Sequence, residues 1–258
     1  MNKFNFNTLD NLSLQDIESE AEFIPLMTSE DEQALNKEAL PQTVPILPLK
    51  NNVLFPGVVI PITAGRDKSI QLIKDANNSD KVIGVVAQKD KKTENPGLKD
   101  IYSLGTVAQI LRVLKMPDGN TTIIIQGKKR FKIDSIVQEK PYLKAKIEDF
   151  IDIETNNKDK EFIATIDSIK DMAINIIKEN PNIPSEASFA IKNIQSQTFL
   201  VNFVSSNMNL IVKDKQEILS IQSLKERALL CLKYMNSEYE KLALKNDIQS
   251  RVRSEMDV

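Results

Sequence analysis

The hydrophobic and polar positions of this chain follow one pattern before about residue 155 and another pattern after it. Before that point, short apolar runs rich in Val and Ile are separated by turns, a pattern typical of β-strands. An Asp-Gly turn at 118–119 separates two of these runs and indicates a hairpin. After residue 160, apolar residues recur at spacings of three and four, which predicts helices. The predicted strands beyond the proline-rich opening lie at 82–87, 106–113, 121–125, 131–137 and 143–150.

The stretch 44–73 opens the strand-rich part and interleaves prolines with Val, Ile, Leu and Phe. Proline fixes φ and lacks an N–H, so neither a central strand nor a helix interior fits across residues 45–61. The stretch therefore predicts short extended pieces at sheet edges, with a sharp turn at 55–57. A helix is expected after Gly65, with one face formed by Ile70, Ile73 and Ala76 or Asn77.

The helical part is separated from the strands by the placement of glycine and proline. All seven glycines lie between Gly57 and Gly127, and no proline follows Pro184. From Ser223 no residue interrupts the apolar period, which predicts one helix of up to ~35 residues, or about 50 Å. A small domain cannot cover a helix of that length, so its charged far end is expected to project. The other predicted helices lie at 162–177, from Pro184 onward, around 199–204 and at 213–220.

These patterns predict an α+β fold: a small N-terminal six-stranded β-barrel-like domain with one helix, followed by an α-helical bundle ending in a long projecting helix. The expected divisions are 1–42, 43–155 and 156–258, with the long helix starting at about residue 223. Residues 1–42 carry nine acidic residues and two lysines, a net charge of −7, and show no sustained apolar period. We therefore expect a mostly disordered acidic leader with one short helix at 29–40, capped by Ser29 with Glu32 as its return partner.

Composition excludes several classes of catalytic and metal site. The 258 residues include no histidine, which removes Ser-His and Cys-His arrangements and the commonest metal ligand. The single cysteine, Cys231, lies in a helical apolar pattern and is interpreted as a core residue in a reducing compartment. Gly127-Lys128 lacks the glycine-rich loop that holds a nucleotide phosphate. The sequence thus predicts no catalytic residue, metal ligand or cofactor, no membrane span and a cytoplasmic location.

The apolar turn at 53–59 and the hairpin loop after residue 115 are the candidate functional surfaces. Seven consecutive residues of mixed periodicity cannot all point inward, so some of them are expected to remain at the surface. With the hairpin loop they would form a shallow apolar patch that recognises hydrophobic side chains of unfolded chains, and core packing is the alternative. The candidate binding residues are Leu54, Phe55, Pro56, Val58, Val59, Met116 and Pro117.

A series of short sequence blocks follows one order along the chain. The blocks are PILPLKNNVLFPGVVIPITAGRDKSI at 45–70, VVAQK at 85–89, DIY at 100–102, GTVA at 105–108, PDG at 117–119, QG and RF within 126–131, and PYL at 141–143. In this order they resemble the N-terminal domain of Lon-type ATP-dependent proteases, and the likeness extends over about residues 43–258. Each block alone is weakly specific, whereas the ordered set is specific.

The resemblance implies a non-catalytic domain for substrate recognition and assembly. Its substrates would be unfolded or damaged proteins. The full-length protein would be a hexameric, ATP-dependent serine endopeptidase, with its ATPase and Ser/Lys protease domains downstream in cis. This chain is then expected to be a piece of that longer protein.

A nucleic-acid-binding module and a free-standing adaptor are the alternative interpretations. Lysine-rich segments at 89–92, 128–132 and 140–146 could line a positive face that binds a phosphate backbone. Ordinary solvated strand edges explain the same lysines, because residues 43–258 carry a net charge of only about +5. Strong salt dependence of binding would favour the nucleic-acid interpretation.

Overall fold

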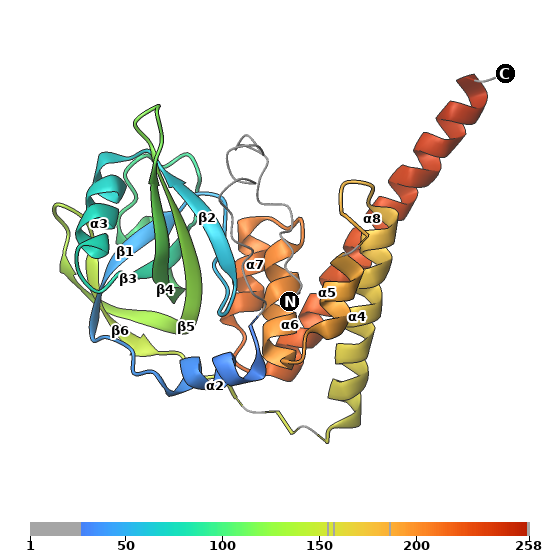
Figure 1. Ribbon diagram of the computed structural model, residues 1–258, viewed down its shortest axis with the longest axis horizontal. Helices are drawn as coiled ribbons and strands as arrows, with labels where there is room; N and C mark the ends of the chain where they lie inside the picture. Colours follow the sequence, from blue (N-terminus) through green and yellow to red (C-terminus); the bar gives the residue numbers. More distant parts are fainter. Residues whose placement is uncertain (1–26, 154, 157, 186, 257–258) are drawn as a thin grey trace. The chain divides into compact units, whose positions relative to one another are not determined.

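The computed structural model describes residues 27–256 except residues 154, 157 and 186 (Figure 1). The chain packs as two compact units. The β unit contains residues 27–152 and 210–222, and the helical unit contains residues 153–209 and the chain from Ser223 onward. The predicted disorder of the leader falls mainly on residues 1–26, which lie outside the described residues.

Six strands form one sheet in the β unit, as the sequence predicts. Their order is β2-β5-β4-β3-β1-β6, and a further pairing between β5 and β6 closes five of the strands into a ring. Only β1 and β3 run parallel; the other pairs are antiparallel. The strands are β1 (Thr43–Leu49), β2 (Val59–Ala64), β3 (Val82–Gln88), β4 (Ile101–Lys115), β5 (Thr121–Gln138) and β6 (Lys144–Asp149).

Strand β5 joins two segments that the sequence predicted as separate strands. Its first residues pair with β2 as far as Gln126, and its last residues pair with β6 from Phe131 onward. Its other edge pairs with β4 on both sides of this change, with a register shift between Gly127 and Arg130. The separation expected between 125 and 131 is therefore wrong, because β4 holds the backbone extended across it.

The prediction that prolines confine 44–61 to sheet edges is right for β2 and wrong for β1. Strand β1 lies between β3 and β6, although it contains Pro45 and Pro48. Its first three residues pair only with β6 and its last four with β3, so each half has one neighbouring strand. A residue without an N–H can therefore turn that side of its backbone away from the ladder.

Strand β2 carries Pro61 at the edge of the sheet. Gly57 N donates to Gly127 O at 2.8 Å, and Gly127 N donates to Val58 O at 2.9 Å. Because antiparallel hydrogen bonding alternates along a strand, Val59, Pro61 and Thr63 turn their backbone groups away from β5. Proline at the middle position removes one donor from that free edge, which weakens it as a template for further strand pairing.

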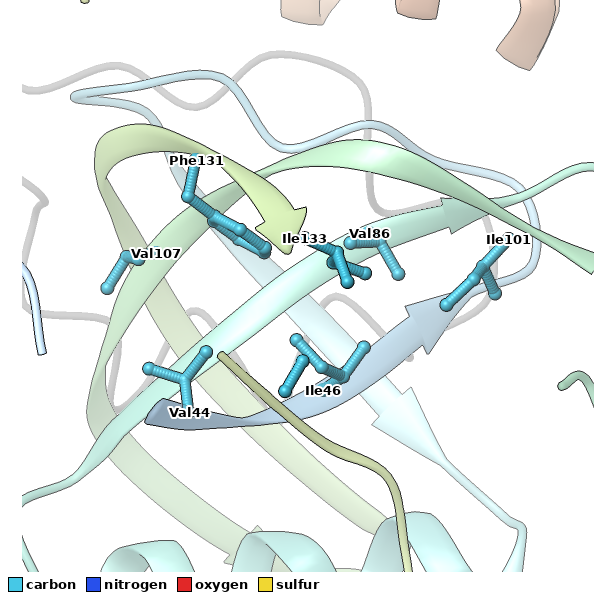
Figure 2. Packing of buried hydrophobic residues seen from close by; sticks show 8 residues of the cluster. Val44, Ile46, Val86, Ile101, Val107, Phe131 and Ile133 are labelled. Atoms are coloured by element: carbon cyan, nitrogen blue, oxygen red, sulfur yellow. The ribbon is translucent and has the colours of Figure 1, made fainter. Parts of the chain in front are cut away.

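The core of the β unit lies inside the ring of strands (Figure 2). Phe131 is fully buried there between residues of β1, β3, β4 and β6. Helix α3 (Asp67–Asn77) buries Leu72, Ile73 and Ala76, whereas Ile70 on the predicted face is only half-buried. A short 3-10 helix, η1 (Leu98–Asp100), precedes β4. The buried cluster consists of Val44, Ile46, Val86, Ile101, Val107, Phe131, Ile133 and Ala145.

Two further helices belong to the β unit. Helix α2 (Ser29–Lys37) is capped by Thr28, one residue before the predicted cap, and Asp31 is its return partner. Glu38 then anchors the segment on β5, because it pairs with Lys128 at 2.6 Å and accepts from Lys129 through its carbonyl oxygen. Part of the expected leader thus packs on the strands.

Helix α7 (Val212–Ser220) also packs on the β unit, although its sequence position suggests the helical bundle. Ile218 and Leu219 are buried, and Gln216 Nε2 donates to Leu104 O at 3.0 Å. The expected division at residue 155 therefore omits one segment of the β unit.

The helical unit is built on two long helices that run in the same direction. At their first turns, Lys225 Nζ of α8 lies 2.8 Å from Asp159 and 2.6 Å from Glu161 of the α4 end. Twenty residues further on, Asn246 Nδ2 donates to Glu179 O at 2.9 Å. The hydrogen bond from Lys225 lowers the pKa of Asp159. The helices are α4 (Lys160–Glu179), α5 (Ala187–Asn193), α6 (Gln197–Asn207) and α8 (Leu224–Met256).

Helix α8 extends beyond the end of α4, as predicted (Figure 1). Ala228, Cys231 and Met235 in its first half are fully buried. Leu244, Ile248 and Val252 are 61%, 51% and 48% exposed. Helix α4 therefore covers the side chains of α8 only as far as about Asn246.

The rate of amide hydrogen exchange along α8 should change near Asn246. Amides between Ala228 and Leu242 should be protected because α4 covers their side chains, and those after Asn246 should exchange quickly. Exchange measured by mass spectrometry after proteolysis would show the step. Uniform protection as far as Met256 would contradict it and would indicate a partner for this segment.

Candidate functional site: an apolar strip on the β unit

The structure separates the predicted binding residues into buried and accessible ones. Leu54, Phe55 and Val58 are 2%, 0% and 4% exposed, so they belong to the core and cannot contact a partner from this position. That part of the predicted patch is corrected in favour of core packing. The accessible members are the half-buried Pro56, Val59 and Met116 and the exposed Pro117.

Close approach of backbone to backbone explains why the 53–58 turn is buried. Gly57 has a φ of 79°, and Val58 N donates to Phe55 O at 3.2 Å, which folds the turn tightly. Thr106 Oγ1 donates to Leu54 O at 2.6 Å from β4. A Cβ at Gly127 would lie 2.3 Å from Phe55 O, so only glycine admits the turn at this place on β5.

The outer face of β2, β5 and β4 carries the accessible apolar residues. Strand pairing places Pro61, Ile124 and Arg112 in one row across the three strands. The next row contains Thr63, Thr122 and Leu114, and the 2.9 Å contact between the two threonine hydroxyls shows that both point to the same side. Ile123 and Ile125, on the opposite face, are fully buried. Alternation therefore places Pro61, Ile124 and Leu114 on the other face, where all three are half-buried and Thr122 is 2% exposed.

These rows connect the two places that the sequence singled out. Val59 lies at one end of β2, and Met116 follows β4 beyond the other end, about 20 Å further along the strand direction at 3.4 Å per residue. Leu111, at an irregularity in the β4 register, is 48% exposed. The apolar strip is defined as Val59, Pro61, Leu111, Leu114, Met116, Pro117 and Ile124.

Sequence reasoning missed Pro61, Leu111, Leu114 and Ile124 as members of this surface. The run Thr121 to Ile125 contains three isoleucines in succession, so its composition does not reveal which one faces outward. The register with β2 and β4 supplies that information. One signal was available in the sequence. The hairpin formed by β4 and β5 has more apolar residues than it has positions facing the core, so some of them had to lie on the outer face.

The lysine-rich segment 128–132 does not form an uninterrupted positive face. Lys128 pairs with Glu38, and Lys129 Nζ donates to the Glu38 carbonyl at 2.7 Å. Lys132 lies directly opposite Glu148 on β6. Acidic groups thus stand beside the basic residues of β5.

The described residues offer little other chemistry. No group of three or more Asp, Glu or Cys side chains among them is placed to hold a metal ion. Cys231 is buried, and burial raises the pKa of its thiol to about 12. Within this part of the chain, no helix combines the length and apolar character needed to cross a membrane.

Comparison with known proteins decides the family. Residues 43–237 match the family model described as the ATP-dependent protease La (LON) substrate-binding domain. The chain belongs to the LON substrate-binding domain family. This assignment agrees with the six-stranded sheet and the helical unit described above.

Relatives and solved structures support the assignment of this LON substrate-binding domain. The chain is 64% identical to a Lon protease of Flavobacterium johnsoniae and 48% identical to one of Cytophaga hutchinsonii, over 97% and 92% of its length. It spans 31% and 29% of those proteins, about a third of their length. In fold it is similar to the N-terminal domain of a Mycobacterium avium complex Lon protease. That match has a TM-score of 0.62 at 19% identity and covers 75% of this chain and 98% of that one.

Substitutions in the turn and in the strip should lower the LON domain's stability by very different amounts. Phe55→Ala should lower the free energy of unfolding by about 3–5 kcal/mol, because it opens a cavity in the core. Met116→Ser should change it by less than about 1 kcal/mol, since the side chain is at the surface. Chemical denaturation followed by circular dichroism measures both. Equal losses would contradict the division into core and surface residues.

Proposed function

We propose that the chain captures hydrophobic segments of unfolded or damaged proteins on the apolar strip, for an ATPase and a Ser/Lys protease in the same polypeptide. The observation that carries this proposal is a band of partly exposed apolar side chains on the outer face of β2, β5 and β4. A folded protein buries its own hydrophobic side chains, whereas an unfolded protein exposes them. Recognition by a shallow apolar surface would therefore select for loss of structure.

The properties of the strip suit weak and unselective binding. Its residues are aliphatic or proline, with Met116 supplying a flexible, polarisable side chain. Half-buried side chains keep their rotamers fixed from one side, so little entropy is lost when a partner covers the other side. Low affinity for any one sequence is useful when many different chains must be accepted.

The names of the relatives support the protease part of the proposal. Proteins that share this chain's sequence over nearly its whole length are Lon proteases about three times as long. We infer that the chain works at one end of such a protease, as a homo-oligomer, in the cytoplasm, and that the full-length protein is an ATP-dependent serine endopeptidase. Under this proposal the domain selects substrates and supports assembly, and performs no chemistry itself.

Nucleic-acid binding is the second candidate, and the pairing of basic groups argues against it. A phosphate backbone needs lysines that are free to exchange their counterions. Lys128 is held by Glu38, and Lys132 faces Glu148, so the positive potential of β5 is partly cancelled.

Polar substitutions in the strip should weaken capture of an unfolded protein. Met116→Ser and Ile124→Ser should each raise the dissociation constant for a permanently unfolded test protein by about three- to tenfold, corresponding to about 1 kcal/mol of lost apolar contact. Leu98→Ser is the matched control, because Leu98 is 49% exposed but lies in η1, outside the strip. Fluorescence anisotropy with a labelled test protein measures binding, and circular dichroism checks folding.

The same titration separates the two candidate functions. Binding that changes little between low and high salt supports apolar capture, whereas a steep loss with salt favours a phosphate backbone. If the strip variants and the Leu98 variant bind as the unmodified chain does, the strip is not the capture surface.

The chain by itself should hydrolyse neither ATP nor an unfolded protein. It contains no glycine-rich phosphate loop and no histidine, and the expected catalytic domains lie outside the segment that it spans. A coupled assay for ADP release and a fluorescent casein digest measure the two activities. Turnover that follows the protein through successive purification steps would contradict this expectation.

A further inference from the structure

Strand β2 has one edge without a partner strand. In the part of the chain that the structure describes, β2 lies at the end of the sheet order and pairs with β5 alone. The residues that turn their backbone groups away from β5 are Val59, Pro61 and Thr63, as the alternation of hydrogen bonds requires. Thr63 is exposed, and Val59 and Pro61 are half-buried. The edge is therefore accessible at three alternate residues.

The backbone groups of this edge form a defined set of donors and acceptors. Val59 and Thr63 each present an N–H and a C=O, whereas Pro61 presents only a C=O. The three residues follow one another at intervals of about 7 Å along the strand. Groups at this repeat match another extended main chain, because its own N–H and C=O groups recur at the same interval.

The side chains of β2 do not block the edge with charge. Edge strands are commonly protected by lysine or by other charged residues. Residues 59–64 carry no charged side chain, and Pro61 is the only protective residue among them. A charged segment would therefore gain no ion pair from β2. An uncharged segment would instead bury apolar side chains beside Val59 and Pro61.

A second copy of this chain fits the edge less well than a foreign segment does. If two β2 strands paired antiparallel over their whole length, Pro61 of one would lie opposite Pro61 of the other. The central pair would then lose both of its hydrogen bonds, because neither proline has an N–H. A segment with another residue at that place donates to Pro61 O and keeps one of the two bonds. The edge thus favours a foreign chain.

We propose that β2 holds substrates by strand addition, in which an extended, uncharged segment of an unfolded protein pairs antiparallel with Val59, Pro61 and Thr63. The segment residues that bond to this edge place their side chains on the same face as Val59 and Pro61, so they extend the apolar strip by one strand. This inference rests on the proposed function and adds how the substrate main chain is held. The edge selects segments with an apolar residue at every second position.

Amide methylation of a test peptide distinguishes main-chain pairing from side-chain contact alone. The probe is a short, labelled peptide in which valine and serine alternate. Methylation of the valine amides removes the donors that face β2 and should raise the dissociation constant about tenfold or more, because each of them loses a hydrogen bond. Methylation of the serine amides, which face away from β2, should change it less than about twofold. Equal effects of the two sets would overturn strand addition.

Hydrogen exchange of the β2 amides locates the peptide on the chain. Without peptide, the amides of Val59 and Thr63 should exchange quickly, whereas those of Ile60 and Ile62 should be protected by their bonds to β5. Saturating peptide should slow exchange at Val59 and Thr63 about tenfold or more, as measured by NMR. Protection of these two amides before peptide is added would contradict the proposal, because another part of the chain or a second copy would then occupy the edge.

A pair of substitutions at Val59 tests one donor from the side of the protein. Val59→Pro keeps an apolar side chain and removes the N–H that points away from β5, whereas Val59→Ala keeps the N–H and removes apolar area. Strand addition predicts that Val59→Pro weakens peptide binding more than Val59→Ala does. The reverse order would show that only the side chain matters. Circular dichroism checks folding, and the methylation comparison on the unmodified chain decides the question if Val59→Pro does not fold.

The same peptides separate this inference from the proposed function. If Met116→Ser weakens binding while the two methylated peptides bind alike, the strip captures substrates through side chains and strand addition is wrong. If methylation of the valine amides alone weakens binding, strand addition is supported, whatever the strip variants show.

Discussion

Strand β5 changes its partner half-way along its 18 residues, from β2 to β6. The β unit depends on the contacts that the residues at this change of partner make. Gly127 leaves room for the 55–57 turn, whose carbonyl would collide with any Cβ there. Phe131 fills the centre of the core, and Arg130 next to it points to the other side and holds the end of α7. Five consecutive positions thus combine a backbone contact, a core contact and a buried charge.

The sequence predicted the elements well and their environments less well. Periodicity located α4 and α8 because each has a long apolar stripe, and it located β3 as a continuous apolar run. It could not assign α7, since a nine-residue amphipathic helix shows that it has a buried face but not which unit buries it. Pro45 and Pro48 misled for a related reason: whether a proline is tolerated depends on which side of each residue has a neighbour.

In the candidate site, too, the sequence predicts which residues are apolar but not which of them are exposed. Phe55 and Met116 are both apolar residues beside turns, and only the structure distinguishes them. Phe55 is buried because its turn lies against Gly127, a contact between residues about seventy positions apart that no local pattern encodes. The outer face of β5 is likewise fixed by its register with β2 and β4. Apolar character is thus a property of sequence, whereas exposure is a property of pairing.

The parallel pairing of α4 and α8 holds the long helix over about its first two thirds and leaves its last turns uncovered. Lys225 and Asn246 fix it to α4 at two points, which resist tilting between them. A rod of 33 residues is about 50 Å long at 1.5 Å per residue. The ten residues beyond Asn246 account for about 15 Å of that length and extend past the second fixed point. A rotation of the helical unit is therefore passed to this end without bending, and whatever contacts the end follows the unit as one rigid piece.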